Sequence, residues 1–539
     1  MKKTYSIVML SICLALVAAM AGCSGRTGGE TSGDNADAKD GIAVYVGTTI
    51  FSESLDPVKG AMSYGYSFTN NALLKVDPQS EYVGDLATDW SVTDDALVYT
   101  FKLRDGVRFS DGSDFTAEDV AFTYNTVKEN QANNENVDLT RLQSAEALDD
   151  YTVEFTLSEP YSPFLDTAAM LGIVPSDGYD SEAFDRFPIG TGAWKVAQYD
   201  ADQQIIVEAN EDYYEGAPAI PRVAIVYLDG EAALPAARSG DLDISMVTPN
   251  FASDRIDGMR LEAFETMDVR NISLPVRAET TMQNADGDEV IVGNDVTSDV
   301  NVRKALAIGI DRATIIENAF NGIGKPAFGF TDNLLWADTE IDADAKRDEA
   351  KGILEAAGWI DADGDGVREK DGRACAFTVY AASSDNDRYL LAAALSEDAK
   401  ELGVDIEVKT ASWDEFGKLQ YSSGIVWGWG QYSPTVLDSL FNSGEFMKGP
   451  FSNVVGYDNA DADARIEAAY GAGDQADAIE NWKEAQRIAN ADYPYLYLVN
   501  IEHCYFVSDA LDISAETQIP HPHGHGSPII CNMKDWTLK

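Results

Sequence analysis

The first 23 residues limit where this chain can fold. Lys2 and Lys3 precede an apolar run of 16 residues, Ser6–Ala21, which Gly22 and Cys23 follow. A basic start, a short apolar segment and small residues before a cut site are the features of a secretory signal. The run is shorter than the roughly 20 residues that a membrane-spanning helix needs. We therefore predict that residues 1–22 are a signal peptide and that the body folds outside the cytoplasm.

The residues around Cys23 predict how the mature chain is held. Met20-Ala21-Gly22-Cys23 resembles a bacterial lipobox, in which the cysteine is lipidated and becomes the new N-terminus. Residues 23–41 are mostly small and polar, a composition typical of a flexible tether. We expect lipidated Cys23 to anchor the body to the outer face of the cell membrane, with no other membrane contact. A transmembrane anchor, or an ordinary signal with a chance cysteine, are the alternatives.

The charge balance limits the partners of the body. The chain has 91 Asp and Glu residues against 39 Lys and Arg residues, a formal net charge of −52. Such a polyanion is repelled by nucleic acid and by anionic lipid. Apolar residues make up 45% of the 539 residues, which allows a large core and several domains. The five cysteines, of which Cys375, Cys504 and Cys531 lie in the body, are too few for a disulfide scaffold.

Hydrophobic periodicity predicts strands and helices mixed along the whole body. Residues 97–103 and 151–157 alternate apolar and polar positions, as half-buried strands do. Residues 302–310 place apolar side chains on one helical face, and a second helical pattern over 350–357 ends at Gly358. The composition stays even after residue 41, so we expect domains that are built from discontinuous segments.

Four blocks spread over the body resemble one protein family. They are LATDW (86–90) with YTFKLRDGVRF (99–109) and FTAEDV (115–120), PIGTGAWKV (188–196), VRKALAIGIDR (302–312), and AAGW (356–359) with DGDG (363–366). In this order, behind a lipobox, they resemble the family 5 solute-binding proteins of ABC importers. That family includes peptide-, nickel- and opine-binding lipoproteins.

The resemblance implies an α/β, two-lobed, periplasmic-binding-protein-like (type II) fold with an extra subdomain in lobe one. It implies a monomer that closes on its ligand and presents it to an ABC permease, while partner subunits hydrolyse ATP. The segments expected are 42–72, 186–275 and 501–539 for the core of lobe one, 73–185 for the extra subdomain, and 276–500 for lobe two.

The residues that follow a Trp-Gly pair in lobe two are predicted to touch the ligand. In peptide-binding members, an acidic residue shortly after a Gly-Trp grips the α-amino group of the peptide. The resemblance places Gln431 or Tyr432 there, and neither is acidic. Trp427 and Trp429 suit a cleft wall because each offers a large rigid face, although core packing is the alternative. Phe51, in an early turn, is the other expected ligand contact.

Three of the four histidines lie close together near the C-terminus. His521, His523 and His525 alternate with Pro522 and Gly524, and this loop could curl around one transition metal ion. Neutral imidazoles suit Ni, Zn or Cu. The alternatives are a structural loop at the lobe junction and direct contact with the ligand. The fourth histidine, His503, is expected to be satisfied within a strand.

An acidic loop follows the helix that is predicted to end at Gly358. Asp361, Asp363 and Asp365 have the spacing of the first half of an EF-hand calcium loop. The twelfth position counted from Asp361 is Gly372 rather than the expected Glu. We therefore predict a solvated turn, with calcium binding as the alternative.

These features together favour a binding receptor over an enzyme. The sequence has no HExxH, GxSxG, P-loop or GxGxxG motif. We predict a receptor for short peptides that requires no cofactor. The first alternative is a receptor for nickel or a metal chelate, with Ni or Zn as cargo at the three histidines. A distant alternative is a secreted metallohydrolase that uses the same histidines.

Overall fold

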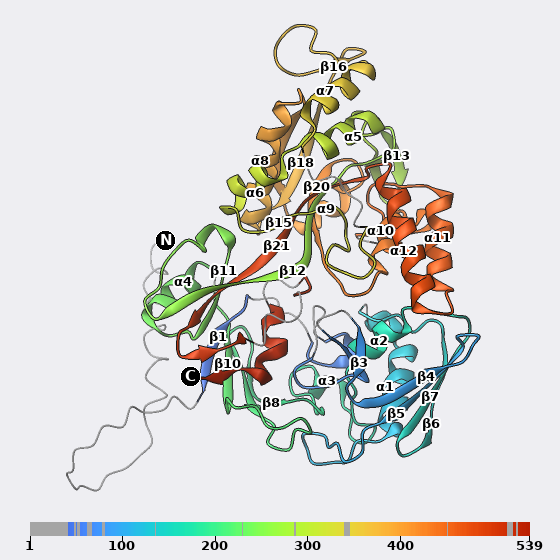
Figure 1. Cartoon of the computed structure of the whole chain (residues 1–539), viewed down its shortest axis with the longest axis vertical. Helices are drawn as coiled ribbons and strands as arrows, with labels where there is room; N and C mark the ends of the chain where they lie inside the picture. The colour runs from blue at the N-terminus through green and yellow to red at the C-terminus, as the bar shows by residue number, and fades with distance from the viewer. Residues whose placement is uncertain are drawn as a thin grey trace, which may run out of the picture. The chain divides into compact units, whose positions relative to one another are not determined.

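Two long strands run through the middle of the molecule and belong to both of its halves (Figure 1). They are β12 (Met259–Ser273) and β21 (Tyr495–Ser508), which pair in antiparallel fashion. Their register shifts between Glu265 and Val269, so residues 266–268 leave the ladder. An irregularity of this kind bends a strand and ends regular pairing. It marks the place where the two halves of the sheet join, and we call it the hinge.

The computed structural model describes residues 41–539 with short gaps. The gaps are residues 48–49, 51–53, 62–66, 78–80, 135, 229, 285–286, 339–344, 450, 515–520 and 524–526. Residues 1–40 form a separate unit and lie outside the described residues. Three of the predicted site residues, Cys23, Phe51 and His525, therefore lie outside the described residues.

Within the described part of the chain, 11 strands form one mixed sheet. The strand order is β19-β18-β20-β12-β21-β11-β1-β10-β9-β8, and β15 pairs with β21 off this path. The pairs at the centre are antiparallel, whereas β1 pairs in parallel with its two neighbours and so does β18. Besides β12 and β21, the strands of this sheet are β1 (Ile42–Tyr45), β8 (Trp194–Asp200), β9 (Gln204–Ala209), β10 (Arg222–Val226), β11 (Ile244–Val247), β15 (Lys325–Pro326), β18 (Ala376–Ala382), β19 (Asp405–Ala411) and β20 (Gly424–Trp429).

The first lobe is built from both ends of the described chain. It contains the sheet from β11 to β8, the helix α4 (Gly230–Ser239) and the C-terminal 3-10 helix η8 (Ser527–Asp535). Its core joins segments far apart in sequence, because Val44, Trp194 and Trp536 are all buried in one apolar cluster. Burying these side chains together fixes the C-terminal segment against the first strand.

The extra subdomain has its own four-stranded sheet and core. Its sheet runs β4-β5-β7-β6, and Phe101, Tyr124 and Phe155 lie in its aromatic core. The alternation predicted over 97–103 is confirmed as β5, in which Tyr99, Phe101 and Leu103 are buried and Lys102 is exposed. The bounds are β4 (Ala87–Val92), β5 (Val98–Leu103), β6 (Leu142–Asp149), β7 (Thr152–Leu157), α1 (Ala117–Glu129), α2 (Phe164–Met170) and α3 (Ser181–Phe184).

The second lobe combines β18, β19 and β20 with most of the helices. The helix predicted over 302–310 is confirmed as α5 (Val300–Gly309), and the one over 350–357 as α7 (Arg347–Ala356), after which Gly358 adopts a φ of 90°. A glycine in this left-handed conformation is a common helix stop. The other helices are α6 (Arg312–Phe320), α8 (Asn386–Lys400), α9 (Trp413–Leu419), α10 (Val436–Phe441), α11 (Ala460–Tyr470) and α12 (Gln475–Asn490).

Four two-stranded sheets complete the described strands. They are β2 (Leu74–Val76) with β3 (Tyr82–Gly84), β13 (Thr280–Gln283) with β14 (Glu289–Val292), β16 (Glu369–Lys370) with β17 (Arg373–Ala374), and β22 (Leu511–Asp512) with β23 (Thr537–Leu538). The segment boundaries that the sequence predicts for the lobes and the subdomain stay a prediction.

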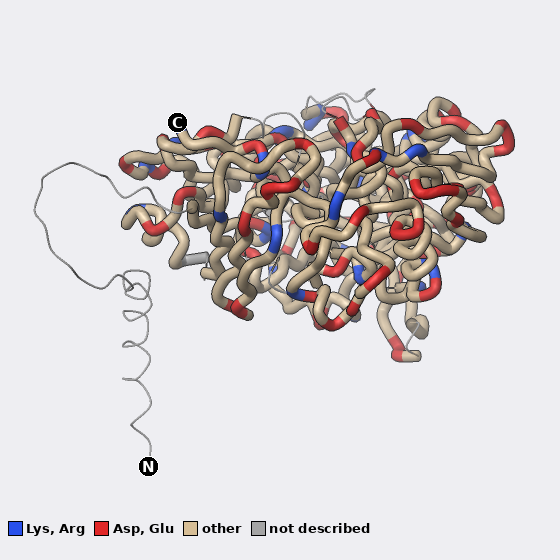
Figure 2. The backbone as a smooth tube through the Cα atoms, turned by 90° about the horizontal axis from the view of Figure 1, so that it is seen from below, with Lys and Arg blue, Asp and Glu red and all other residues tan. Residues whose placement is uncertain are grey.

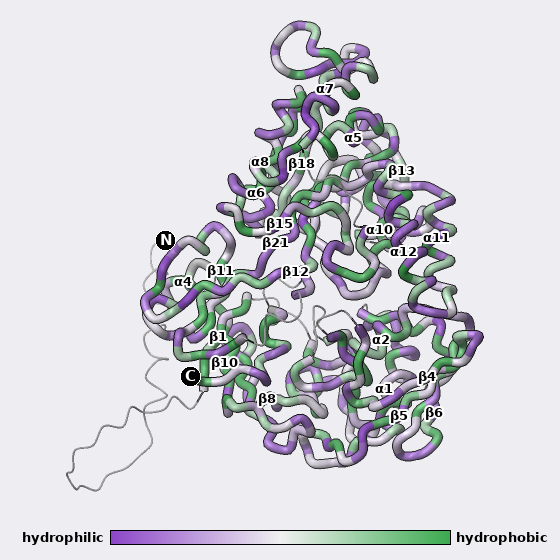
Figure 3. The backbone as a smooth tube through the Cα atoms, viewed as in Figure 1, coloured by the Kyte–Doolittle hydropathy of each residue, from purple (hydrophilic) through white to green (hydrophobic). Residues whose placement is uncertain are grey.

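The surface agrees with the charge balance of the sequence. Figure 2 shows acidic positions spread over the body and outnumbering the basic ones. Along outer helices such as α11 and α12, hydrophilic and hydrophobic positions alternate, as expected for helices with one buried face (Figure 3). In the residues that the structure describes, every helix is too short or too polar to cross a membrane.

Candidate functional site

An aromatic cluster surrounds the end of β20 beside the hinge. The Trp427 and Trp429 ring centroids lie 5.5 Å apart, and the Trp427 ring lies 6.3 Å from Trp413 and 5.6 Å from Phe451. Trp427 is only 2% exposed, whereas Trp413 is 42% and Phe451 is 45% exposed. The outer face of the cluster is therefore formed by Trp413 and Phe451, which the sequence did not single out. Trp429 is half-buried and packs its edge against Phe330.

The residues after Trp429 divide between surface and core. Gln431 is exposed and Tyr432 is buried, so the two predicted ligand contacts differ in accessibility. Gly428 and Gly430 let this segment approach the hinge closely. A Cβ atom on Gly428 would collide with the Arg270 guanidinium, and one on Gly430 would lie 2.8 Å from the Met267 carbonyl oxygen. Only glycine fits at such an approach without a shift of its neighbours.

A buried charged cluster occupies the hinge directly behind Gly428. Asp268 is fully buried, forms an ion pair with Arg270, and lies 2.7 Å from His523 through its Oδ2 and the histidine Nδ1. Burial opposes ionisation, but Arg270 and His523 outweigh it and hold the pKa of Asp268 well below its ordinary value. Burial lowers the pKa of His523 despite the nearby carboxylate.

The structure brings His521 next to His503, which lies 18 residues earlier in the sequence. His521 pairs in parallel with Thr266 of the hinge, and its ring stacks on Phe264 with centroids 5.2 Å apart. Its Nδ1 lies 3.4 Å from Nδ1 of His503 on β21. Burial, followed by the neighbouring His521, lowers the pKa of His503 well below its ordinary value. His503 lies in a strand as predicted, but it is not satisfied there, because its buried Nε2 has no hydrogen-bond partner among the described residues. It also faces His521, a proximity that sequence spacing could not reveal.

The N-terminus of α8 adds a second group of charges next to the aromatic cluster. Arg388 donates hydrogen bonds to the Val426 carbonyl oxygen at 2.7 Å and to Asp385 at 2.9 Å, and its guanidinium lies over the Trp413 ring. Asp387 accepts a hydrogen bond of 3.0 Å from Asn250, which lies in the 3-10 helix η5 (Pro249–Phe251) of the first lobe. Burial, followed by Asp385, raises the pKa of Asp387 to about 6.

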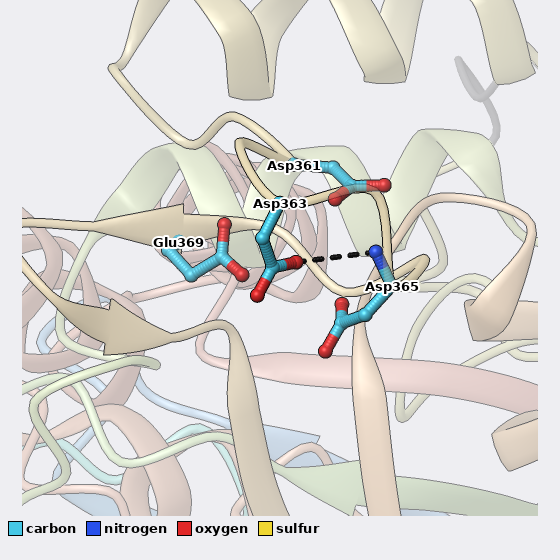
Figure 4. A group of neighbouring side chains, drawn as sticks. All are labelled: Asp361, Asp363, Asp365 and Glu369. Carbon is cyan, nitrogen blue, oxygen red and sulfur yellow. Dashed lines mark hydrogen bonds between the residues drawn. The ribbon is translucent and has the colours of Figure 1, made fainter.

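The acidic loop after α7 folds as a turn at the surface. Figure 4 shows Asp361, Asp363, Asp365 and Glu369 gathered together, with ligand oxygens within 4.8 Å of one another. Asp361 accepts from the Gly364 backbone N–H at 2.8 Å, and Asp363 accepts from the Asp365 N–H at 3.1 Å. The three aspartates are exposed. These bonds to the loop's own backbone fit the predicted solvated turn, and calcium binding stays an alternative prediction.

Comparisons with known proteins cover almost the whole chain. A family model described as bacterial extracellular solute-binding proteins, family 5, middle, matches residues 81–448. The chain is 30% identical to protein XP55 of Streptomyces lividans over 533 residues, which are 95% of this chain and 94% of that protein. It is 26% identical to the oligopeptide-binding protein AppA of Bacillus subtilis over 529 residues, 92% of this chain and 93% of that protein.

A solved structure shares the fold. NikZ from Campylobacter jejuni, in complex with Ni(L-His), superposes with a TM-score of 0.75 at 22% identity and covers 93% of this chain and 100% of NikZ. The predicted two-lobed α/β fold is thereby confirmed. Because the family model spans more than half of the sequence, the chain belongs to the bacterial extracellular solute-binding proteins of family 5.

Proposed function

We propose that this protein captures short peptides between its lobes and delivers them to the permease of an ABC importer. As a member of an extracellular family it works outside the cytoplasm. The observation that carries the peptide assignment is the similarity to oligopeptide-binding AppA over more than nine-tenths of both chains. The relatives bind solutes rather than transform them, and the receptor needs no cofactor of its own.

The end of β20 offers the edge that an extended peptide requires. β18 pairs with β20 only at Gly424 and Ile425, so among the described residues no strand pairs with 426–429 on that side. An extended peptide can add itself to such an edge through backbone hydrogen bonds, while side-chain pockets give selectivity. The aromatic cluster around Trp427 and Trp429 would supply apolar walls there, and exposed Gln431 would supply a neutral polar contact.

A metal chelate is the second candidate because of the histidines at the hinge. Two imidazole nitrogens bound to one tetrahedral ion at 2.0–2.1 Å lie about 3.4 Å apart, and Nδ1 of His503 and Nδ1 of His521 have this spacing. His523 faces Asp268 instead. In this case Ni or Zn would be the cargo, bound directly or through an organic chelator. The protein would then share with NikZ the kind of ligand as well as the fold.

Native mass spectrometry separates the two candidates. The secreted chain lacking residues 1–23 would be purified without a histidine tag or a chelator. A ladder of co-purifying peptide masses is expected, unchanged in His521→Ala. A single Ni, Zn or Cu adduct that His521→Ala abolishes would contradict the peptide assignment and establish metal cargo.

The aromatic wall can be tested on the same preparation. We expect Trp429→Ala to weaken peptide affinity about tenfold, because it removes a large apolar face from the end of β20. Trp359→Ala, in a separate apolar core of the second lobe, is a control for the loss of a tryptophan elsewhere. Affinity of Trp429→Ala within twofold of the native value would remove Trp429 from the ligand site.

The membrane anchor is a further part of the proposal. Lipidation of Cys23 would hold the receptor at the outer face of the membrane and beside its permease. Blocking the lipoprotein signal peptidase in the producing cell should leave a precursor of higher mass that keeps residues 1–22. An unchanged mobility of the protein under that block would contradict the anchor.

A further inference from the structure

A second cavity lies away from the hinge, where the extra subdomain meets the second lobe. It has about 90 Å³ of free space. A buried water occupies about 10–15 Å³ on the same measure, so the cavity has room for about six water molecules or more. α2 and β4 lie next to α11 and α12 at this junction (Figure 1). The lining residues used below are Trp90, Leu165 and Asp166 of the subdomain and Trp336, Ile479 and Trp482 of the second lobe.

The polar feature of this cavity is the carboxyl group of Asp166. It is 7% exposed and accepts hydrogen bonds from the Tyr82 hydroxyl and, at 3.1 Å, from Ser433 Oγ of the second lobe. In the described ranges no salt bridge neutralises it. A carboxylate can accept about four hydrogen bonds, so two protein donors leave capacity for a ligand.

The energetics of Asp166 favour a cationic partner. Burial raises the pKa of Asp166 to about 6, although Tyr82 and Ser433 lower it. At neutral pH the group is therefore ionised in a poorly hydrated place. A buried charge of this kind is costly unless it is paired. A cation that enters the cavity would relieve this cost.

The walls of the cavity are suited to the same partner. Trp90, Trp336 and Trp482 all line it, and the faces of indole rings attract cations. Leu165 and Ile479 complete an apolar surface that can hold the methylene chain of a lysine. Aromatic and apolar walls beside a buried carboxylate match a long side chain with a terminal positive charge.

The position of the cavity connects it to the proposed peptide site. Pro434 lines the cavity and Ser433 donates to Asp166, while Trp429 lies only a few residues earlier on the same segment. Five extended residues span at most about 18 Å. A peptide bound along β20 can therefore place one of its side chains in the cavity.

We propose that this cavity is a specificity pocket that takes a basic side chain, such as lysine, of the bound peptide, with the ammonium group against Asp166. The inference rests on the proposed peptide function and names a preference within it. Because the lining comes from both lobes, a side chain in the pocket also bridges them and favours the closed form.

The test is competitive capture from a random peptide library. The secreted protein is incubated with peptides of two to nine residues in which lysine and norleucine are present in equal amounts, and retained peptides are quantified by mass spectrometry. Norleucine has nearly the length and apolar stem of lysine without the charge. We expect the native protein to retain lysine peptides at least fivefold over norleucine peptides at pH 7.5.

Substitutions identify the pocket as the source of this preference. Asp166→Asn and Asp166→Ser should reduce the ratio to about one while norleucine peptides are still retained, which also shows that the variants fold. Asp438→Asn is the matched control, because it removes a half-buried carboxylate of α10 that accepts a hydrogen bond from the Tyr470 hydroxyl and does not line the cavity. It should keep the native ratio.

Each outcome decides between the two proposals. Retention of peptides by the native protein with a ratio near one overturns the specificity pocket and leaves the peptide function intact. A high ratio that persists in both Asp166 variants also overturns it. Retention of no peptide at all overturns the proposed function itself.

Discussion

The two lobes meet at the hinge and again at the distal junction, where the extra subdomain contacts α11, α12 and the segment before α10. At the hinge the contact is continuous backbone, and the buried Asp268 has Arg270 and His523 as partners. At the distal junction no described strand crosses between the lobes, and the contacts are side-chain packing and single hydrogen bonds such as that from the Ser162 backbone N–H to the Tyr470 carbonyl oxygen at 2.9 Å. Among the described residues, the buried Asp166 accepts from the hydroxyl groups of Tyr82 and Ser433.

This difference separates what holds the lobes together from what can respond to a ligand. A fully paired charge cluster is satisfied without cargo, so it fixes local structure around the bulge in β12. A carboxylate with neutral donors in a cavity is not fully compensated. The hinge therefore defines the axis of any closure, whereas the distal junction is where a ligand can change the balance between open and closed forms.

The largest expected effect comes from breaking the hinge cluster. Asp268→Ala leaves the Arg270 guanidinium buried without its ion-pair partner, and removal of one member of a buried pair costs about 3–5 kcal/mol. Urea unfolding at pH 7 should show a loss of this size in the free energy of unfolding. The control is Asp89→Ala on β4, an exposed carboxylate whose loss should change it by less than about 0.5 kcal/mol. Equal effects would mean that the hinge cluster is not a stabilising unit.

The second prediction concerns the pH dependence of the distal junction. The folded-state pKa of Asp166 is about 6, above its ordinary value of 3.8, so the folded protein binds this proton more tightly than the unfolded chain. The stabilisation is present at pH 4 and is lost as pH rises through 6. Relative to Asp166→Asn, the peptide-free native protein should lose about 2 kcal/mol between pH 4.5 and pH 7.

Urea midpoints of the two proteins at pH 4.5, 5.5 and 7 measure this loss. The comparison with Asp166→Asn matters because the pKa of Asp387 is also raised to about 6. Asp387 titrates in both proteins, so its contribution to the pH dependence cancels in the difference. If the free energies of unfolding of the two proteins changed in parallel with pH, the charge of Asp166 would be stabilised as well in the folded state as in the unfolded chain. A saturating lysine-containing peptide should flatten the native profile.

The scaffold could be predicted because its signals are local. The alternation that became β5 and the helical face that became α5 each depend on fewer than a dozen neighbouring residues. A capping box starts α1 at Thr116, with Asp119 accepting from the Thr116 backbone N–H at 2.8 Å. Caps and turns of this kind satisfy backbone groups within one turn, so they can be identified without knowledge of the tertiary fold.

The sites could not be predicted because distant segments build them. His503 and His521 meet only because the segment at 521 pairs with the hinge bulge. Asp166 is one of 91 acids in the chain, and its burial depends on contacts with the second lobe. The one local signal was an acid placed between apolar residues of α2. Trp427, predicted for a cleft wall, is only 2% exposed because Trp413 and Phe451 pack against it, and its contact with a ligand stays a prediction.

A smaller effect is expected from one hydrogen bond across the distal junction. Ser433→Ala removes the donor from the second lobe to the Asp166 carboxylate, and hydrogen bonds to charged groups contribute about 1.5–3 kcal/mol. Ser162→Ala removes a bond of 2.8 Å to the neutral Ala469 carbonyl oxygen at the same junction, for which about 1 kcal/mol is expected. Thermal unfolding at pH 7 compares the two variants. A larger loss from Ser162→Ala would contradict an ionised Asp166.

The smallest effect tests whether aromatic rings at the distal junction hold a cation. The Arg141 guanidinium lies 4.9 Å from the ring centroids of both Tyr161 and Tyr470, which stack on each other across the two lobes. Arg141→Met keeps the apolar stem and should lose about 0.5–1 kcal/mol of unfolding free energy. Arg141 also pairs with the exposed Glu159, and salt weakens such a surface pair. If the aromatic rings dominate, the loss of stability in Arg141→Met should therefore persist at 1 M NaCl. Glu159→Gln should not change the free energy of unfolding at this salt concentration. Persistence would show that a cation on aromatic faces already joins the lobes at this junction, which is the chemistry proposed for a lysine beside Asp166.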